Sequence, residues 1–203
     1  IQCGDTLANG DYVLTADVGP CPSTGPALTV SSAKLNLNGF TVRCESVYTP
    51  NMVYSQGVVL TSSNSALSNG SVSGCGNGVV LGGGGGHTVS YINSGGWIGF
   101  VVNSCRNTVR YSNGKGPFAG FIVNGKRNNI HHNTAGNASY GLSIFGEDNV
   151  ASQNDTTTSF GIYVSGLGHQ IENNNTVGGL VGIIVENATN VDITQNDASG
   201  AAR

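Results

Sequence analysis

The stretches GFVVNSCRNTVRYSNGKGPFA (residues 99–119) and GFIVNGKRNNIHHNTAGNASY (residues 120–140) follow one another directly and share one pattern. Each begins with a glycine and three apolar residues, and each ends in a polar, turn-rich segment. Such glycine-led strands recur along the chain at steps of 21, 21, 21, 21, 20 and 21 residues. Their glycines are Gly57, Gly78, Gly99, Gly120, Gly141, Gly161 and Gly182. A constant period of this length is the mark of a repeat architecture.

Asparagine forms a second column with the same period, and its members follow short segments such as HTVSY and NNIHH. The column consists of Asn38, Asn69, Asn93, Asn113, Asn133, Asn154, Asn174 and Asn196. A repeat of about 21 residues without a helix is too short for a propeller blade and fits one coil of a solenoid. Coils stacked at about 4.8 Å would bring these amides into hydrogen-bonding contact. We therefore expect an asparagine ladder.

The repeats resemble the right-handed parallel β-helix superfamily, which includes pectate lyases and related carbohydrate-active proteins. The segment ALTVSSAKLNLNGFTV (residues 27–42) is similar to the first coil of many secreted members. The resemblance covers roughly residues 27 to 203 and implies an all-β, right-handed parallel β-helix solenoid. Residues 1–26 would form an N-terminal cap, and the last coil would be uncapped. One fold hosts many functions, so the resemblance implies an architecture rather than an activity.

Alternation within the glycine-led strands predicts which residues face the core. The first and third residues after each glycine should point inward and the middle one outward. The outward column is Thr29, Val59, Val80, Val101, Ile122, Ser143, Tyr163 and Ile184. Most of it is apolar, so either the insertion at residues 45–56 folds over it or it is a surface for a partner or ligand. Both interpretations stay open.

Cysteine spacing predicts two disulfides. Cys44 and Cys75 each lie six residues after a column asparagine, so they should stack in adjacent coils. Cys3 and Cys21 can close a loop that holds the cap over the first coil. Cys105 is left over, either buried or available for an intermolecular bond.

The five cysteines and several Asn-X-Ser/Thr sequons suit an extracellular (secreted) or periplasmic protein. Ladder positions should bury Asn69, Asn154 and Asn174, which leaves Asn137 and Asn187 as the expected glycosylation sites. A net charge of −3 supplies no basic face for nucleic acid. No apolar run approaches the roughly 20 residues that a membrane span needs.

Charged residues are scarce, yet five of the eight Lys and Arg residues lie between positions 106 and 127. They are Arg106, Arg110, Lys115, Lys126 and Arg127. Counted from the repeat glycine, Arg106, Arg127 and Asp148 share offset seven and should form one column. Arg110, His131 and Glu172 share offset eleven and should form another.

This cationic flank predicts binding of an acidic polysaccharide, because Arg binds carboxylate and sulfate oxygens bidentately. His131 would be the base of a lyase or epimerase reaction, with Arg110 and Arg127 neutralising the substrate carboxylate. The remaining substrate-binding residues would be Arg106, Lys115, Lys126, Asp148 and Glu172. The alternative interpretation is a set of solvated turn residues without a ligand.

Two enzyme families are not matched. The Asp-Pro-His-Glu motif of mannuronan epimerases and the paired aspartates of polygalacturonases are absent, so whether the protein is an enzyme stays open. Calcium-dependent lyases cluster several carboxylates, which the isolated Glu147, Asp148 and Glu172 imitate poorly. We expect no cofactor, with calcium as the alternative.

The remaining histidines and aromatic residues are assigned structural roles. His131 and His132 are adjacent on a predicted strand and should point to opposite faces, which argues against a shared metal. His87 and His169 are interpreted as surface turn residues. Aromatic residues before the repeat glycines are expected to stack inside the core rather than to form a sugar platform. They are Trp97, Phe118, Tyr140 and Phe160.

A second hypothesis for function is a non-catalytic structural protein. It would assemble into a filament, a surface layer or a homo-oligomer through the apolar outer strand face, the open last coil or Cys105.

Overall fold

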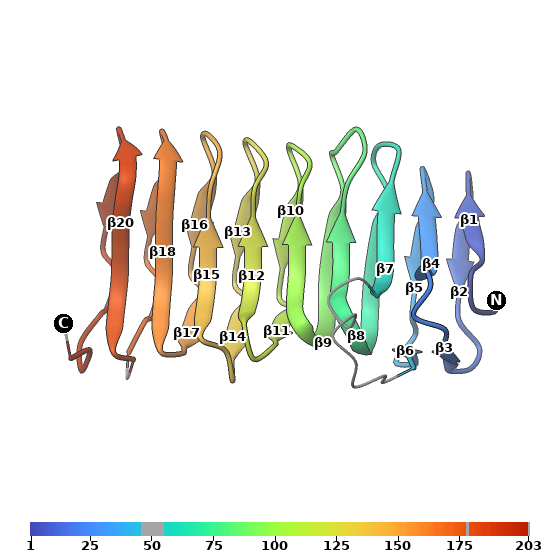
Figure 1. Cartoon of the computed structure of the whole chain (residues 1–203). Coiled ribbons are helices and arrows are strands. Elements are labelled where there is room, and N and C mark those ends of the chain that lie inside the picture. The colour runs from blue at the N-terminus through green and yellow to red at the C-terminus, as the bar shows by residue number, and fades with distance from the viewer. Residues whose placement is uncertain (46–54, 178, 203) are drawn as a thin grey trace.

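The computed structural model describes residues 1–45, 55–177 and 179–202. Every regular element within these ranges is a strand, and all strand pairs are parallel. The chain winds into a parallel β-helix with the N-terminus and C-terminus at opposite ends (Figure 1). The predicted fold class is confirmed.

The strands lie on three faces, and equivalent strands of successive coils stack on each face. The first face, at the front of Figure 1, contains β1 (Thr6–Ala8), β4 (Pro26–Ser31), β7 (Gln56–Thr61), β12 (Ala119–Val123), β15 (Tyr140–Ile144), β18 (Phe160–Leu167) and β20 (Val181–Thr189). The second face contains β2 (Asp11–Val13), β5 (Lys34–Asn36), β10 (Thr108–Arg110), β13 (Asn129–His131), β16 (Val150–Ser152), β19 (Gln170–Glu172) and β21 (Asp192–Thr194). The third face contains β3 (Val18–Cys21), β6 (Thr41–Cys44), β11 (Asn113–Lys115), β14 (Thr134–Gly136) and β17 (Asp155–Thr157). The long strands β8 (Ala66–Leu81) and β9 (Thr88–Val102) run through all three faces.

The predicted alternation along the first face is confirmed. Phe100 and Val102 are fully buried, and so are the equivalent residues of the neighbouring coils. The ring of Phe100 stacks on that of Phe121 in the next coil, with centroids 4.7 Å apart. Because equivalent residues pair in register, one apolar core runs along the axis of the helix.

The repeat glycines are required by the close approach of neighbouring coils. A Cβ placed on Gly120 would lie 2.8 Å from the carbonyl oxygen of Gly141 and 2.7 Å from the Cβ of Ala135. A Cβ on Gly99 would lie 2.7 Å from the carbonyl oxygen of Gly120. Any side chain in this column would therefore push two coils apart, which explains why glycine carries the repeat.

The predicted asparagine ladder is present between the second and third faces. The N–H and Nδ2 of Asn133 donate to Oδ1 of Asn154 at 3.0 and 3.1 Å. Asn154 donates in the same way to Asn174, and Asn174 to Asn196. Ser112 begins this series by donating its N–H to Asn133. The ladder therefore satisfies turn amides that water cannot reach.

The ladder prediction is wrong for Asn38, Asn69, Asn93 and Asn113. Asn113 pairs in register with Thr134, because Ser112 occupies the ladder position of its coil. Asn69 lies one residue before the equivalent position, with a φ of 58°, and its side chain is exposed. Since Asn69 is not buried, the reason for excluding it as a glycosylation site does not hold. The predicted sites Asn137 and Asn187 are also exposed.

A second ladder, called the first-turn ladder, connects the turns between the first and second faces and was not predicted from the sequence. Its members are Ser65, His87, Asn107, Asn128, Asn149 and His169. Nδ1 of His87 accepts from the N–H of Ser65 at 3.1 Å, so its proton lies on Nε2, 2.7 Å from the Gly82 carbonyl oxygen. His87 and His169 are both fully buried. Their assignment as surface residues was wrong, because an imidazole nitrogen replaces the amide oxygen here.

Acid should destabilise the protein through His87. Burial lowers the pKa of His87 below its ordinary value of 6.5, although the hydrogen bond to the Gly82 carbonyl oxygen opposes the shift. The unfolded chain therefore takes up a proton as pH falls below about 6.5, while folded His87 resists protonation. Stability should be complete above that pH and decline below it. His87→Asn keeps an acceptor for Ser65 and should lose less stability between pH 7 and pH 5 in urea unfolding. An equal loss in both proteins would rule out His87 as a contributor.

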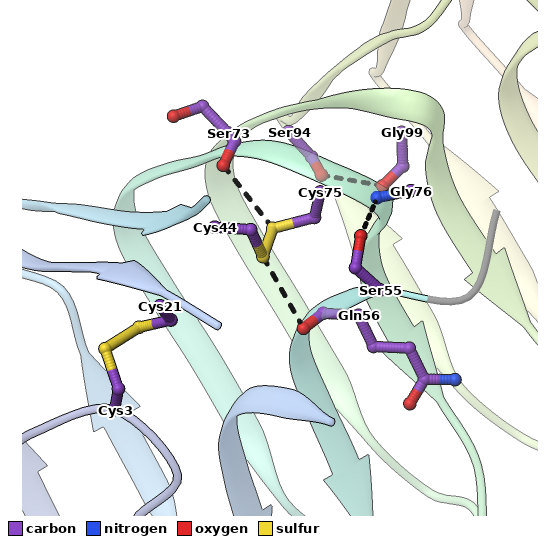
Figure 2. The surroundings of a disulfide bond; sticks show 10 residues. All are labelled: Cys3, Cys21, Cys44, Ser55, Gln56, Ser73, Cys75, Gly76, Ser94 and Gly99. Carbon is purple, nitrogen blue, oxygen red and sulfur yellow. Dashed lines mark hydrogen bonds between the residues drawn. A yellow bond between two sulfur atoms is a disulfide. The ribbon is translucent and has the colours of Figure 1, made fainter. Parts of the chain in front are cut away.

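Both predicted disulfides are present (Figure 2). Cys3 is bonded to Cys21, and Cys44 to Cys75. Cys44 pairs in register with Cys21, so the second bond continues the column of the first. Cys105 is free and partly buried. Two disulfides are typical of a protein from an oxidising compartment outside the cytoplasm. Within the described ranges, no helix has the length and hydrophobicity needed to cross a membrane.

The segment expected to form the N-terminal cap is itself wound into strands. β1 pairs with β4, β2 with β5 and β3 with β6, each in parallel. Apolar residues of this segment, including Leu7, Leu14 and Val18, are buried at the start of the core. The covalent link from Cys3 to Cys21 therefore lies in a coil that packs directly on its successor.

Candidate functional site

The column of Arg106, Arg127 and Asp148 is present in the turns between the first and second faces. All three residues have positive φ angles, of 58°, 56° and 53°. Each lies immediately before a member of the buried first-turn ladder. The ladder residue points inward, while these three side chains remain outside the core.

Two cations in or next to this column, Lys126 and Arg127, form ion pairs with carboxylates of the next coil. Lys126 Nζ lies 2.8 Å from Glu147 Oε2, and the hydrogen bond to this carboxylate raises the pKa of Lys126. Arg127 Nε lies 3.5 Å from Asp148 Oδ2. Among the described residues, Arg106 forms no ion pair. It is therefore the cation of this group most available to a ligand.

These side chains surround a shallow depression of about 300 Å³. Its lining residues are Cys105, Arg106, Lys126, Arg127 and Glu147. Arg110 and His131, the other predicted catalytic residues, do not line it. They lie side by side on the second face, where β10 pairs with β13, and Ser152 separates His131 from Glu172. Lys115 is exposed on the third face. The cationic flank is thus spread over different faces of the helix.

His131 and His132 lie closer together than the sequence pattern predicts. Strand β13 ends at His131, and His132 has a φ of 55°, so strict alternation stops between them. Their Nδ1 atoms lie 2.9 Å apart and share a hydrogen bond. The prediction that they point to opposite faces was wrong. Burial lowers the pKa of His131, and the charges of His132 and Arg110 lower it further.

The carboxylates do not gather into a metal site. Within the part of the chain that the structure describes, no group of three or more His, Cys, Asp or Glu side chains could hold an ion. Glu147 and Asp148 instead pair with cations of the preceding coil.

The aromatic residues before the repeat glycines form an external column, so the expectation of interior stacking was wrong. Trp97 stacks on Phe118 with ring centroids 6.1 Å apart. Phe118 contacts Tyr140 at 5.8 Å, and Tyr140 stacks on Phe160 at 5.1 Å. Trp97 and Phe118 are each 40% exposed. The core does not need these rings, because the residues after each glycine fill it.

A groove of about 400 Å³ lies beside the aromatic column on the first face. Its lining residues are Phe118, Ile122, Tyr140, Ser143, Phe145, Tyr163 and Glu186. The hydroxyl of Tyr163 donates to Oε2 of Glu186 at 3.3 Å. Burial raises the pKa of Tyr163, and the negative charge of Glu186 adds to this effect. The groove therefore combines apolar ring faces with a polar pair at one end.

The groove occupies the part of the outward column that remains accessible. Val59, Val80 and Val101 are at most 8% exposed, whereas Ile122 and Tyr163 are half-buried and line the groove. Most of the insertion proposed to cover this column, residues 46–54, lies outside the described residues. A second hollow, of about 670 Å³, contains Pro117, Ser139 and Ser159, each of which directly precedes an aromatic residue of the column. The aromatic column thus lies between two hollows.

Comparison with known proteins supports the architecture. No protein-family model and no curated protein matches the sequence. The crystal structure of the Dettilon tailspike protein matches 98% of this chain with a TM-score of 0.71 and 14% identity. The chain spans about half, 52%, of that tailspike chain. The structure of DFA-IIIase from Arthrobacter chlorophenolicus A6 without its lid matches 86% of this chain and 71% of its own length, with a TM-score of 0.50 and 13% identity. At these identities the likeness shows a shared β-helix fold.

Proposed function

We propose that the protein binds a polysaccharide laid along the axis of the helix, across the outer surface of the first face. The observation that carries this proposal is the exposed column formed by Trp97, Phe118, Tyr140 and Phe160. Aromatic faces bind apolar faces of ligands, and here one ring is presented by each successive coil. The adjoining groove supplies hydrogen-bonding groups, which fix the orientation of a bound ligand.

The cationic depression around Arg106 favours a polysaccharide that carries acidic groups. Phe145 lines the groove, and Glu147, two residues later, lines the depression, so the two surfaces adjoin. A chain that lies in the groove as far as Phe145 would direct its carboxylate or sulfate substituents toward this depression, where Arg106 has no ion pair among the described residues. The Arg guanidinium can donate two parallel hydrogen bonds to such an oxyanion. The resemblance to carbohydrate-active β-helix proteins agrees with this ligand class.

The proposal is limited to binding. A lyase or epimerase reaction would need His131, Arg110 and Arg127 to act on one sugar, but only Arg127 borders the depression. Incubation with a panel of uronate polysaccharides, followed by ultraviolet absorbance, would detect unsaturated products. Sizing of the protein in the same buffer tests the hypothesis of self-assembly.

Phe118→Ala should weaken binding of the polysaccharide by about three- to tenfold, because one stacking contact is lost. Affinity electrophoresis against neutral and acidic polysaccharides measures this change. Tyr91→Asn is the matched control: Tyr91 is exposed and stacks on Tyr111, but it lies outside the groove. Asn also suits its φ of 57°. In the same assay Arg106→Ala should weaken only the acidic ligands. Unchanged binding in Phe118→Ala would refute the aromatic platform.

A further inference from the structure

The histidine pair at the end of β13 is the strongest feature that polysaccharide binding does not explain. Nδ1 of His131 and Nδ1 of His132 face each other at 2.9 Å. The arrangement depends on the backbone, because the left-handed φ of 55° at His132 turns its ring toward that of His131. Tyr111 packs against both rings, with centroids 6.1 and 4.9 Å away. The rings are therefore packed against the preceding coil.

The separation of the two nitrogens suits a metal ion with ligands at right angles. Histidine nitrogens bind divalent metals at about 2.0–2.1 Å. Two such nitrogens at a right angle to each other are separated by about 2.9 Å, whereas tetrahedral ligands are separated by about 3.3 Å. The observed 2.9 Å is the length of the hydrogen bond that the two atoms share and is close to the right-angle case, so the rings need only turn until both lone pairs point at one ion. Tetragonal coordination by nitrogen is typical of Cu²⁺, which also binds such ligands most strongly among divalent first-row metals.

We propose that His131 and His132 chelate one Cu²⁺ ion through their Nδ1 atoms, with water in the remaining positions. In the metal-free pair one Nδ1 carries the proton of the shared hydrogen bond. Binding requires this proton to leave Nδ1 and a proton to occupy Nε2 of the same ring, so the ring stays neutral and changes tautomer. Arg110 lies beside the pair and opposes an added positive charge, which limits the affinity.

The histidine inventory predicts one such site per chain. The chain contains four histidines. His87 and His169 are fully buried, and their ring nitrogens bond to the backbone within the first-turn ladder. Of the four, only His131, which is half-buried, and His132, which is exposed, are accessible to solvent. Copper bound through imidazole should therefore saturate at one equivalent.

Isothermal titration with CuSO₄, combined with electron paramagnetic resonance, tests the proposal on the intact protein. The variants are His131→Ser and His132→Asn. Ser90 and Ser152 occupy the same column as His131 in other coils. Asn173 occupies the same column as His132 and has a φ of 54°. Both changes therefore introduce a residue that this position already holds in another coil. Circular dichroism and thermal unfolding establish that each variant is folded.

Chelation predicts that each single variant loses at least about tenfold in copper affinity, because the second nitrogen binds at a high effective concentration. The double variant should then lose little more. The resonance spectrum of the wild type should show two nitrogen ligands. If the histidines bound separately, each single variant would keep affinity within about twofold, and that result overturns the proposal. Absence of a one-equivalent site in the wild type would overturn it as well.

Discussion

Asn154→Ala should lower the free energy of unfolding by about 3 kcal/mol or more, a large share of the roughly 5–15 kcal/mol that is typical of a native protein. Asn154 is 3% exposed and bonds to both neighbouring coils. Its Oδ1 accepts the N–H and Nδ2 of Asn133, and its Nδ2 donates to Ile130 O at 2.8 Å and to Asn174 Oδ1 at 3.0 Å. Alanine would leave several of these buried groups without a partner, and each costs about 1–3 kcal/mol.

Urea unfolding followed by circular dichroism measures this loss. Asn124→Ala is the matched control, since Asn124 also bonds to an asparagine 21 residues away, Asn103, at 2.8 Å. Both of these side chains are exposed, so water replaces the lost bond and the cost should stay below about 0.5 kcal/mol. If the two variants lost similar stability, burial would not be the source of the strength of the ladder.

Gly120→Ala should be nearly as damaging, with a loss of about 2–3 kcal/mol from one added methyl group. The new Cβ would lie 2.8 Å from the Gly141 carbonyl oxygen and 2.7 Å from the Cβ of Ala135. These are a backbone atom and a short side chain, so neither can swing away. The two coils would have to separate, which would weaken the strand pairing on the first face.

Gly136→Ala provides the comparison for this prediction. Gly136 also lies in a strand, β14, but a Cβ there would meet no atom within 4 Å. The change should be neutral or slightly stabilising, because alanine has fewer unfolded conformations to lose. Thermal unfolding of both variants gives the measurement. Equal stability of Gly120→Ala and wild type would contradict the close approach of the coils.

The fold was predictable because two periodicities agree. Alternation assigns the inward residues of each glycine-led strand, and the 21-residue step places them in register. Phe100 and Phe121 show this agreement, since both were predicted to face inward and their rings stack in the core. A repeat of this kind fixes neighbours by counting alone, so the disulfide between Cys44 and Cys75 was also predictable.

The ladders were harder to predict because the structure selects an acceptor atom and not a residue type. Ser112 and His87 accept a backbone N–H of the preceding coil as asparagine does elsewhere in the ladders. A column defined by asparagine alone therefore does not include them. A useful signal was present in Asn107, Asn128 and Asn149, which follow one another at steps of 21 residues. They directly follow the charged residues Arg106, Arg127 and Asp148 at offset seven.

The candidate site depends on backbone conformations that sequence does not reveal. Alternation assigned His131 and His132 to opposite faces, but the strand ends between them and φ becomes positive. A positive φ is uncommon in any residue other than glycine, so the strand pattern alone does not indicate it. The aromatic column was misplaced for a different reason: Trp97 and Phe118 read as core residues by hydrophobicity, while the core was already full.

A left-handed residue follows the second-face strand in seven successive coils of the described chain, which makes the protein a scaffold with exchangeable surface positions. The residue at this position bonds to the neighbouring coil through its backbone in several coils, for example at His132 and Gln153, so its side chain is not needed for that bond. The type of side chain at this position accordingly differs from coil to coil. The successive occupants are Asn69, Tyr91, Tyr111, His132, Gln153, Asn173 and Gln195. Substitutions at this position in successive coils can therefore introduce a row of new ligand contacts along this edge without changing the buried core.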